Sequence, residues 1–233
     1  MQIETVFLDA GGVLVYPNWT RVADAMARRG VAVTSAALAA AEPRAKKQID
    51  TGHVVRATND AQRGWTYFNV VLTAAGVPLS DATAEALAEL HNYHREWNLW
   101  ETVPPDVPAA LGSLRARGFR LVVVSNANGT LQRAFDRVGL TPLVDLLVDS
   151  FVEGVEKPDP RFFHLALERA GASVASTVHV GDLYHVDVVG ARAAGITPVL
   201  LDAADLYESC DCVRVRSLSE LAARLSADDA IMP

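Results

Sequence analysis

Short apolar runs alternate with helix-like segments over most of this chain. β-Branched and aliphatic residues predict strands at 3–8, 120–124, 144–148, 177–180, 198–201 and 213–215. Apolar periodicity, with glycine after most segments, predicts helices over 106–117, 130–138, 160–170, 185–194 and 218–225. Continuous apolar strands separated by helices of about ten residues are typical of a parallel sheet with both faces buried. We therefore expect an α/β core with helices on both faces of the sheet.

The segment from Asn18 to Asn98 differs in composition and in its predicted secondary structure. It is rich in alanine, contains no strand-like run, and predicts four helices at Thr20–Arg29, Ser35–Asp50, Asp60–Ala75 and Asp81–Glu96. Because it lies between the first strand and all the others, it is an insertion in the core. We predict a core domain of residues 1–16 and 99–233 and an all-helical domain of residues 17–98.

Composition narrows the class of protein. The 233 residues are 50% hydrophobic, which excludes a disordered chain, and the net charge of −7 argues against a nucleic-acid or anionic-membrane partner. The first residues lack a cationic segment followed by an apolar one, and the longest nearly apolar stretch, 31–41, is too short to span a bilayer. We expect a soluble cytoplasmic protein, and the sequence makes no prediction of its oligomeric state.

Polar residues that can do chemistry follow the predicted strands. In an open parallel sheet, ligands bind beyond the carboxyl ends of the strands. The loops at that edge contain six such residues: Asp9, Ser125, Asn126, Lys157, Asp182 and Asp187. We therefore expect these side chains to gather at one edge of the sheet.

Three aspartates in one place require a positive charge among them. Without one, each carboxylate would raise the pKa of the others. A hard divalent ion with oxygen ligands, most simply Mg²⁺, resolves this conflict. A lysine and a serine beside such an ion form a receptor for a phosphoryl group, which a free aspartate could attack.

Four segments of the chain resemble the motifs of the haloacid dehalogenase (HAD) superfamily, most of whose members are phosphatases that form an aspartyl-phosphate. In the family's order, the segments are Phe7–Leu14, Val122–Ala127, Glu156–Pro160 and Gly181–Asp187. The resemblance implies a Rossmann-like core with a helical cap inserted after the first motif. It also implies a small phosphorylated metabolite as the substrate and Mg²⁺ as the cofactor.

The resemblance assigns a role to each matching residue. Asp9 would be the nucleophile and a metal ligand, with Asp182 as a second ligand and Asp187 bound to the metal directly or through water. The backbone carbonyl of Gly11 would be a further ligand. Ser125 and Lys157 would take part in catalysis, and both would bind the phosphoryl group together with Asn126.

Gly11 departs from the pattern of the family's phosphatases. Those enzymes carry a second aspartate two residues after the nucleophile, where it protonates the leaving oxygen and then activates water. This chain has glycine there, and loss of a general acid–base typically costs about 10²–10⁴ in rate. We expect weak activity that favours good leaving groups such as acyl or aryl phosphates.

Two other functions remain open. The superfamily's metal-independent 2-haloacid dehalogenases also lack that second aspartate, although they typically lack the paired acids seen here as Asp182 and Asp187. A catalytically silent module that binds a phosphorylated ligand or a protein partner is the third interpretation. Phosphoryl transfer ranks first because a site without a metal has little use for both acids.

Several other chemically capable residues receive a structural interpretation. We expect His179 to be a hydrogen-bonded core histidine, and Cys210 and Cys212 to be incidental. The remaining residues of this kind are expected to lie on solvated faces, to pack near the junction of the two domains or to lack a third metal ligand: Lys46, Lys47, His53, Arg56, His91, His94, Trp97 and Trp100.

Overall fold

The structure, a computed structural model, describes residues 3–225. These residues divide into two compact units. One unit contains the described residues up to Tyr16 and from Thr102 onward, and we call it the core unit. The other contains Pro17–Glu101, and we call it the helical unit.

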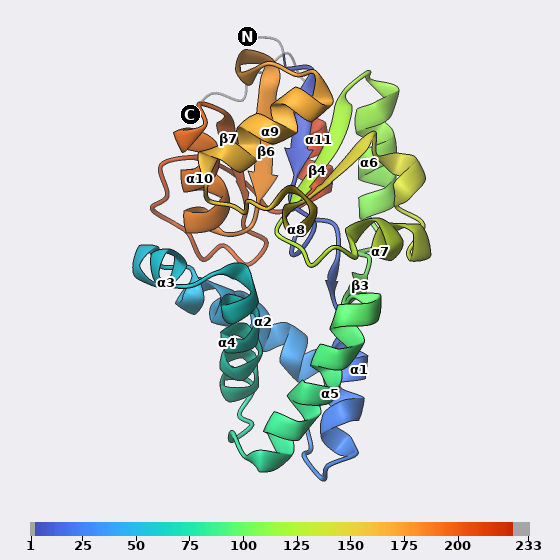
Figure 1. The fold of residues 1–233 in the computed structure, drawn as a ribbon, viewed down its shortest axis with the longest axis vertical. Helices are drawn as coiled ribbons and strands as arrows, with labels where there is room; N and C mark the ends of the chain where they lie inside the picture. Colours follow the sequence, from blue (N-terminus) through green and yellow to red (C-terminus); the bar gives the residue numbers. More distant parts are fainter. Residues whose placement is uncertain (1–2, 226–233) are drawn as a thin grey trace. The chain divides into compact units, whose positions relative to one another are not determined.

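The core unit is built on a six-stranded parallel sheet with the strand order β5-β4-β1-β6-β7-β8 (Figure 1). Its strands are β1 (Thr5–Leu8), β4 (Arg120–Ser125), β5 (Leu146–Asp149), β6 (Thr177–Gly181), β7 (Thr197–Leu201) and β8 (Val213–Val215). The first strand of the chain is central, with Phe7 opposite Val122 of β4 on one side and opposite His179 of β6 on the other. The predicted parallel α/β core is confirmed.

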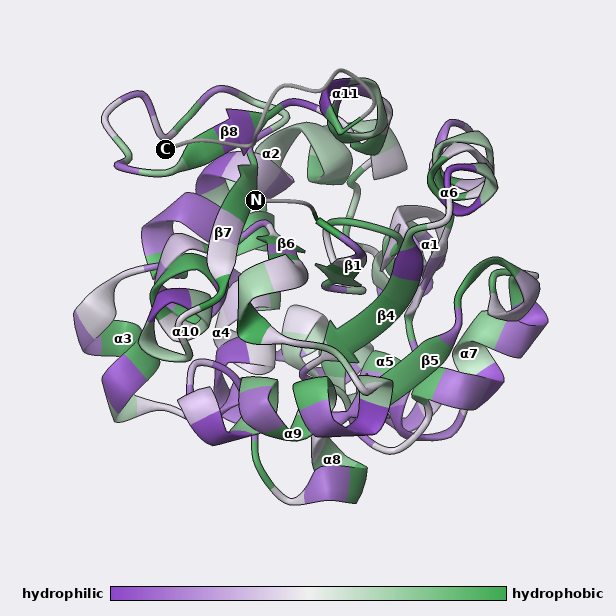
Figure 2. Cartoon of the chain, turned by 90° about the horizontal axis from the view of Figure 1, so that it is seen from above, coloured by the Kyte–Doolittle hydropathy of each residue, from purple (hydrophilic) through white to green (hydrophobic). Residues whose placement is uncertain are grey.

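Helices pack on both faces of this sheet (Figure 2). On one side lie α9 (Pro160–Ala170) and α10 (Val189–Ala193), and on the other lie α6 (Val107–Ala116) and α11 (Leu218–Arg224). Phe7, Val122 and Val124 of the sheet pack with Phe162 and Phe163 of α9 in one fully buried cluster. Burial of such aliphatic and aromatic side chains contributes about 1.5–3 kcal/mol each, so this layer holds the strand ends in place.

Short elements account for most differences from the predicted pattern. The predicted helix over 185–194 is a five-residue π-helical segment, η3 (Tyr184–Val188), followed by α10. A four-residue helix, α8 (Ser150–Glu153), follows β5 directly and was not predicted, because one turn shows no periodicity. The remaining elements of the core unit are α7 (Leu131–Arg137) and the short 3₁₀ helices η1 (Thr141–Leu143) and η2 (Val174–Ser176).

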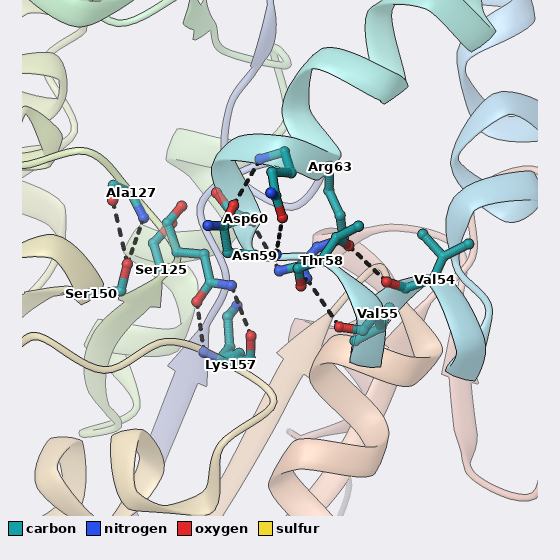
Figure 3. A network of polar contacts seen from close by, with 12 residues as sticks. Val54, Val55, Thr58, Asn59, Asp60, Arg63, Ser125, Ala127, Ser150 and Lys157 are labelled. Atoms are coloured by element: carbon teal, nitrogen blue, oxygen red, sulfur yellow. Dashed lines mark hydrogen bonds and ion pairs between the residues drawn. The ribbon is translucent and has the colours of Figure 1, made fainter.

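The helical unit has its own apolar core. Its helices are α1 (Trp19–Ala27), α2 (Ser35–Ile49), α3 (Gly52–Ala57), α4 (Asp60–Ala74) and α5 (Asp81–Trp97), and α3 was too short to be predicted. Each begins with a polar side chain that accepts a hydrogen bond from the helix N-terminus, supplied by Asn18, Thr34, Thr51, Asn59 and Ser80. The Arg63 guanidinium donates to the carbonyls of Thr58 and Val55, which ties α4 to α3 (Figure 3).

A two-stranded sheet lies where the chain passes between the two units. It pairs β2 (Tyr16–Pro17) with β3 (Trp100–Thr102). Next to it, the Asn18 N–H donates to the Leu99 carbonyl at 2.9 Å. These strands were not predicted, because two or three residues carry no alternating pattern. Among residues 3–225, no helix is long and apolar enough to cross a membrane.

Candidate active site

The three central strands deliver polar residues to the same edge of the sheet. Asp9 follows β1, Ser125 ends β4, and Asp182 follows β6. Because β1 is hydrogen-bonded to both β4 and β6 in parallel, these three positions are neighbours. The structure thus brings Asp9 together with two residues that are each more than a hundred positions away in the sequence.

Lys157 links two of the predicted carboxylates. Its Nζ lies 2.9 Å from Asp9 Oδ1 and 2.8 Å from Asp187 Oδ1. The side chains of Lys157 and Asp187 are each 1% exposed, whereas that of Asp9 is 13% exposed. The ammonium is therefore buried between two acids, and Asp9 is the member of the triad that solvent can reach.

Asn126 holds the backbone of Lys157. Its Nδ2 donates to the Lys157 carbonyl at 3.0 Å, and its Oδ1 accepts from the Lys157 N–H at 2.8 Å. The peptide bond from Lys157 to Pro158 is cis. Both polar groups of the Asn126 side chain thus act on Lys157, whereas we had expected this residue to contact substrate. Its contact with substrate stays a prediction.

Asp187 is held from three directions. Its Oδ1 also lies 3.0 Å from His179 Nε2, and its Oδ2 accepts from the Leu183 N–H at 3.1 Å. His179 in β6 is fully buried, as expected, but only one ring nitrogen is hydrogen-bonded, because Nδ1 has no partner. Because a carboxylate only accepts, His179 carries its proton on Nε2 when it bonds Asp187.

A glycine makes room for this acid. A Cβ atom at Gly181 would lie 2.0 Å from Asp187 Cγ, so no side chain fits there while Asp187 keeps its place. The sequence contained both signals, a polar residue within an apolar strand and a glycine directly before Asp182. We had interpreted His179 only as part of the core and had assigned no role to Gly181.

The two acids beside Lys157 have pKa values that are shifted in opposite directions. Burial raises the pKa of Asp9, Lys157 opposes that shift, and the charges of Asp187 and Asp182 add to it, so that the pKa lies at about 7. Burial also acts to raise the pKa of Asp187, but Lys157 and His179 outweigh it and hold that pKa well below its usual range. Burial acts to lower the pKa of Lys157, and Asp187 and Asp9 reverse the effect and raise it. Lys157 is therefore charged and paired with an ionised Asp187.

The three acids fit a hard divalent cation. One carboxylate oxygen from each of Asp9, Asp182 and Asp187 lies within 4.8 Å of the other two. Oxygen donors in this number suit Mg²⁺, and the repulsion that raises the pKa of Asp9 is what a cation would relieve. Both oxygens of Asp187 already accept hydrogen bonds, which suits this residue to a contact with the cation through water.

The chain turns sharply after Asp9. The Val15 N–H donates to the Ala10 carbonyl, and the Gly12 N–H donates to the Val15 carbonyl, both at 2.9 Å. Gly12 has φ +78°, which glycine adopts without strain, while Gly11 is not among the described residues with positive φ. The backbone conformation at position 11 therefore does not require glycine. The role of the Gly11 carbonyl as a ligand stays a prediction.

The loop after Ser125 is fastened to α8. Ser150 Oγ accepts from the Ala127 N–H at 3.0 Å and lies 3.3 Å from the Ala127 carbonyl (Figure 3). Ser125 is 4% exposed, and its hydroxyl lies 3.4 Å from the Asn126 carbonyl. Ser125 thus lies at the predicted edge, in a loop held at a fixed point.

Sequence relatives include proteins named as phosphatases. The chain is 36% identical over 127 residues to haloacid dehalogenase-like hydrolase domain-containing protein 3 of Bos taurus, a match that covers 54% of this chain and 50% of that protein. It is 37% identical over 111 residues to ribulose-1,5-bisphosphate 5-phosphatase of Halopiger xanaduensis, which covers 46% of each. The chain thus spans about half the length of the curated relatives it matches.

The fold is also that of solved hydrolases. L-2-haloacid dehalogenase from Xanthobacter autotrophicus, solved with chloropropionic acid covalently bound, matches with a TM-score of 0.61 and 18% identity. That match covers 98% of this chain and 100% of the dehalogenase. A family model described as haloacid dehalogenase-like hydrolase matches residues 3–195. This model spans most of the chain and all four predicted motifs, and the protein therefore belongs to the haloacid dehalogenase-like hydrolases.

Proposed function

We propose that this hydrolase is a Mg²⁺-dependent phosphatase that acts on a small phosphorylated metabolite through an aspartyl-phosphate. The observation that carries the proposal is the placement of Asp9, which is held by Lys157 within reach of two further acids. Phosphatase-named relatives support this assignment. The paired acids also favour it over a reaction that needs no metal.

Asp9 would supply the nucleophile. Its Oδ1 accepts hydrogen bonds from the Ala10 N–H at 2.7 Å and from Lys157, so Oδ2 is the oxygen we assign to the attack on phosphorus. Lys157 would offset the negative charge on the phosphoryl group as it approaches Asp9. Two oriented donors on one oxygen fix the carboxylate plane before substrate arrives, which lowers the entropic cost of the attack.

The other predicted residues complete the site. Asp9, Asp182 and the Gly11 carbonyl would hold Mg²⁺, with Asp187 acting through water. When bound, the ion would neutralise charge on the phosphoryl oxygens as a Lewis acid. Ser125 would donate a hydrogen bond to a phosphoryl oxygen, and Asn126 would position Lys157. The helical unit would serve as a cap that selects substrate and excludes water.

Gly11 would limit both halves of the reaction. Glycine at this position supplies no side chain that could protonate a leaving alkoxide or deprotonate the hydrolytic water. Transfer to Asp9 should therefore favour leaving groups that depart without a proton, and hydrolysis of the aspartyl-phosphate should be slow. Acyl and aryl phosphates are the substrate class that this site suits.

The test is phosphate release from acetyl phosphate and p-nitrophenyl phosphate, with Mg²⁺ and with EDTA. We expect turnover that is lost in EDTA and in Asp9→Asn. Asp24→Asn removes a charge from an exposed position of α1 and should leave turnover unchanged. Turnover that survives in Asp9→Asn would refute the aspartyl mechanism.

The dehalogenase is the second candidate, favoured by Gly11. It predicts halide release from a 2-haloacid in the presence of EDTA and no phosphate release in any condition. A silent binding module would show neither activity. Halide release that persists in EDTA would therefore replace our proposal with the dehalogenase.

A further inference from the structure

Cys210 and Cys212 are placed to react with each other, although we expected no role for them from the sequence. Their sulfur atoms lie 3.6 Å apart, and Cys210 Sγ donates to the Cys212 carbonyl at 3.5 Å. Both side chains are partly exposed, so a small reagent can reach them. They are the only two cysteines of the chain.

The residue between them touches the segment that carries Asp187. Asp211 Oδ1 accepts from the Tyr184 hydroxyl at 2.7 Å, and Oδ2 accepts from Arg192 Nη1 at 2.8 Å. Arg192 Nη2 also donates to the Asp211 carbonyl at 2.5 Å. Tyr184 is the first residue of η3, which contains Asp187, and Arg192 lies on α10. Asp211 thus fastens the cysteine loop to both elements.

Apolar packing reinforces this contact. Tyr184, Leu206, Cys210 and Cys212 pack against a small buried cluster formed by Val188, Leu200 and Tyr207. The loop therefore rests on η3 through both polar and apolar groups. Any change in the backbone around Asp211 has to be met by a change in these contacts.

We propose that Cys210 and Cys212 form a thiol–disulfide site, and that closing the disulfide loosens η3 and α10 through Asp211. The sulfur atoms must approach from 3.6 Å to about 2.05 Å to bond. Closing this short ring, in which Asp211 is the one intervening residue, is expected to shift the Asp211 backbone. Arg192 donates hydrogen bonds to both the carboxylate and the carbonyl of Asp211. A shift of the Asp211 backbone would therefore break or lengthen at least one of these hydrogen bonds.

The oxidant is a low-molecular-weight disulfide such as oxidised glutathione. One cysteine thiolate attacks a glutathione sulfur, forms a mixed disulfide and releases the first glutathione thiol. The second cysteine thiolate then attacks the protein sulfur of the mixed disulfide and expels the second. Two electrons pass from the cysteine pair to the glutathione disulfide, and the two thiol protons end on the released glutathione.

The structure also assigns an order to the two steps. Burial raises the pKa of Cys212 to about 12, with the hydrogen bond and charge of Cys210 adding to the shift. Cys212 is therefore a thiol at neutral pH, and Cys210 is the residue expected to capture glutathione first.

The first measurement is the mass and thiol count of the protein after treatment with oxidised glutathione at pH 8.5. We expect two reactive thiols to fall to none, with a mass loss of two hydrogen atoms, reversed by dithiothreitol. Cys212→Ser should instead retain one glutathionyl group on Cys210. Two glutathionyl groups on the native protein, a dimer linked through cysteine, or two persistent thiols would each overturn the proposal.

The second measurement is hydrogen–deuterium exchange of the peptide amides over 184–193. Exchange should be several-fold faster in the oxidised protein than in the reduced one. Cys210→Ser treated in the same way is the control and should show no change. In Asp211→Asn, which weakens the link, oxidation should change the exchange much less. A disulfide that forms without any change over 184–193 would refute the coupling.

Neither measurement depends on enzymatic turnover. Both can succeed if the phosphatase assay fails, and both can fail if it succeeds. The two proposals are therefore tested separately.

Discussion

Asn126 hydrogen-bonds both the N–H and the carbonyl of one residue, Lys157. The amide therefore fixes the backbone from which the buried ammonium reaches Asp9 and Asp187. Loss of this support should let Nζ move away from Asp9, and a displacement near 1 Å can cost about 10²-fold in rate.

We expect Asn126→Ala to lower kcat on acetyl phosphate by about 10- to 100-fold, with a smaller change in KM. Asn126→Asp keeps the acceptor for the Lys157 N–H, and its kcat should lie between those of the native protein and Asn126→Ala. Asn92→Ala removes an exposed amide that contacts Arg95 in the helical unit and is the matched control. A rise in KM with unchanged kcat would show instead that Asn126 binds substrate.

Gly181 and Gly112 make a second matched pair. An alanine Cβ at position 181 would collide with Asp187 at 2.0 Å, whereas at position 112 in α6 nothing lies within 4 Å. Gly181→Ala should cost about 3 kcal/mol of unfolding free energy and most of the turnover, because Asp187 must move. Gly112→Ala should stabilise the helix by about 0.5–1 kcal/mol and leave turnover unchanged. Urea unfolding and kcat measured on both variants test the contrast, and a stable, active Gly181→Ala would contradict it.

Mg²⁺ should stabilise the fold if Asp9 and Asp182 bind it. At a hundred times its Kd, an ion that binds only the folded state adds about 2.7 kcal/mol, which is readily seen as a rise in Tm. The rise should disappear in Asp182→Asn and persist in Asp159→Asn, whose carboxylate contacts Arg161 at the surface. An equal shift in both variants would place the ion elsewhere.

Gly11→Asp should restore the missing proton donor. The variant should turn over alkyl phosphates faster by about 10²-fold and acyl phosphates by much less, because only the alkoxide needs a proton. Gly11→Asn is close to it in size but cannot exchange a proton and should show no gain. An Asp variant that folds and is no faster than the Asn variant would contradict the role assigned to position 11.

His94 should make the helical unit sensitive to acid. Burial lowers the pKa of His94 to about 4, with the charge of His91 adding to the shift. Its Nδ1 accepts from the Leu99 N–H at 3.1 Å, which requires the neutral ring. The unfolded chain, with a histidine pKa near 6.5, therefore binds more protons, and stability falls as the pH drops from about 6.5 to 4.

This shift corresponds to at most about 3 kcal/mol, lost over that pH range. In His94→Asn the side-chain oxygen can replace Nδ1 as acceptor without titrating. The loss of Tm between pH 7 and pH 4.5 should therefore be smaller in the variant than in the native protein. Equal losses would mean that other groups govern the acid response.

Much of this architecture could be predicted because residue type and helix-ending glycines indicate the same elements that the structure contains. The β-branched run at 120–124 became β4 with one added residue, Ser125, and the glycine after Ala170 ends α9 in the left-handed conformation that glycine favours. Parallel strands with buried faces leave their polar residues at the ends, so the sequence alone assigns Asp9, Ser125 and Asp182 to one edge of the sheet.

Tertiary contacts explain what could not be predicted. The π-helical segment at Tyr184–Val188 arises where Asp187 folds back to accept from the Leu183 N–H, and no local pattern encodes that. The link from Asn126 to Lys157 joins residues 31 positions apart. Their sequence neighbours therefore contain no sign of the pairing.

The pairing of β2 with β3 has a consequence for how such a protein can diversify. The chain leaves the sheet-bearing unit at residues 16–17 and returns at residues 100–102, and these two points are hydrogen-bonded to each other. The two ends of the intervening segment are thus held together by this pair of strands. Replacing it with a segment of another length would require no change in strand order or in the loops that hold Asp9 and Lys157. Selection can therefore exchange this segment as one piece while the strands and loops that position Asp9 and Lys157 stay unchanged.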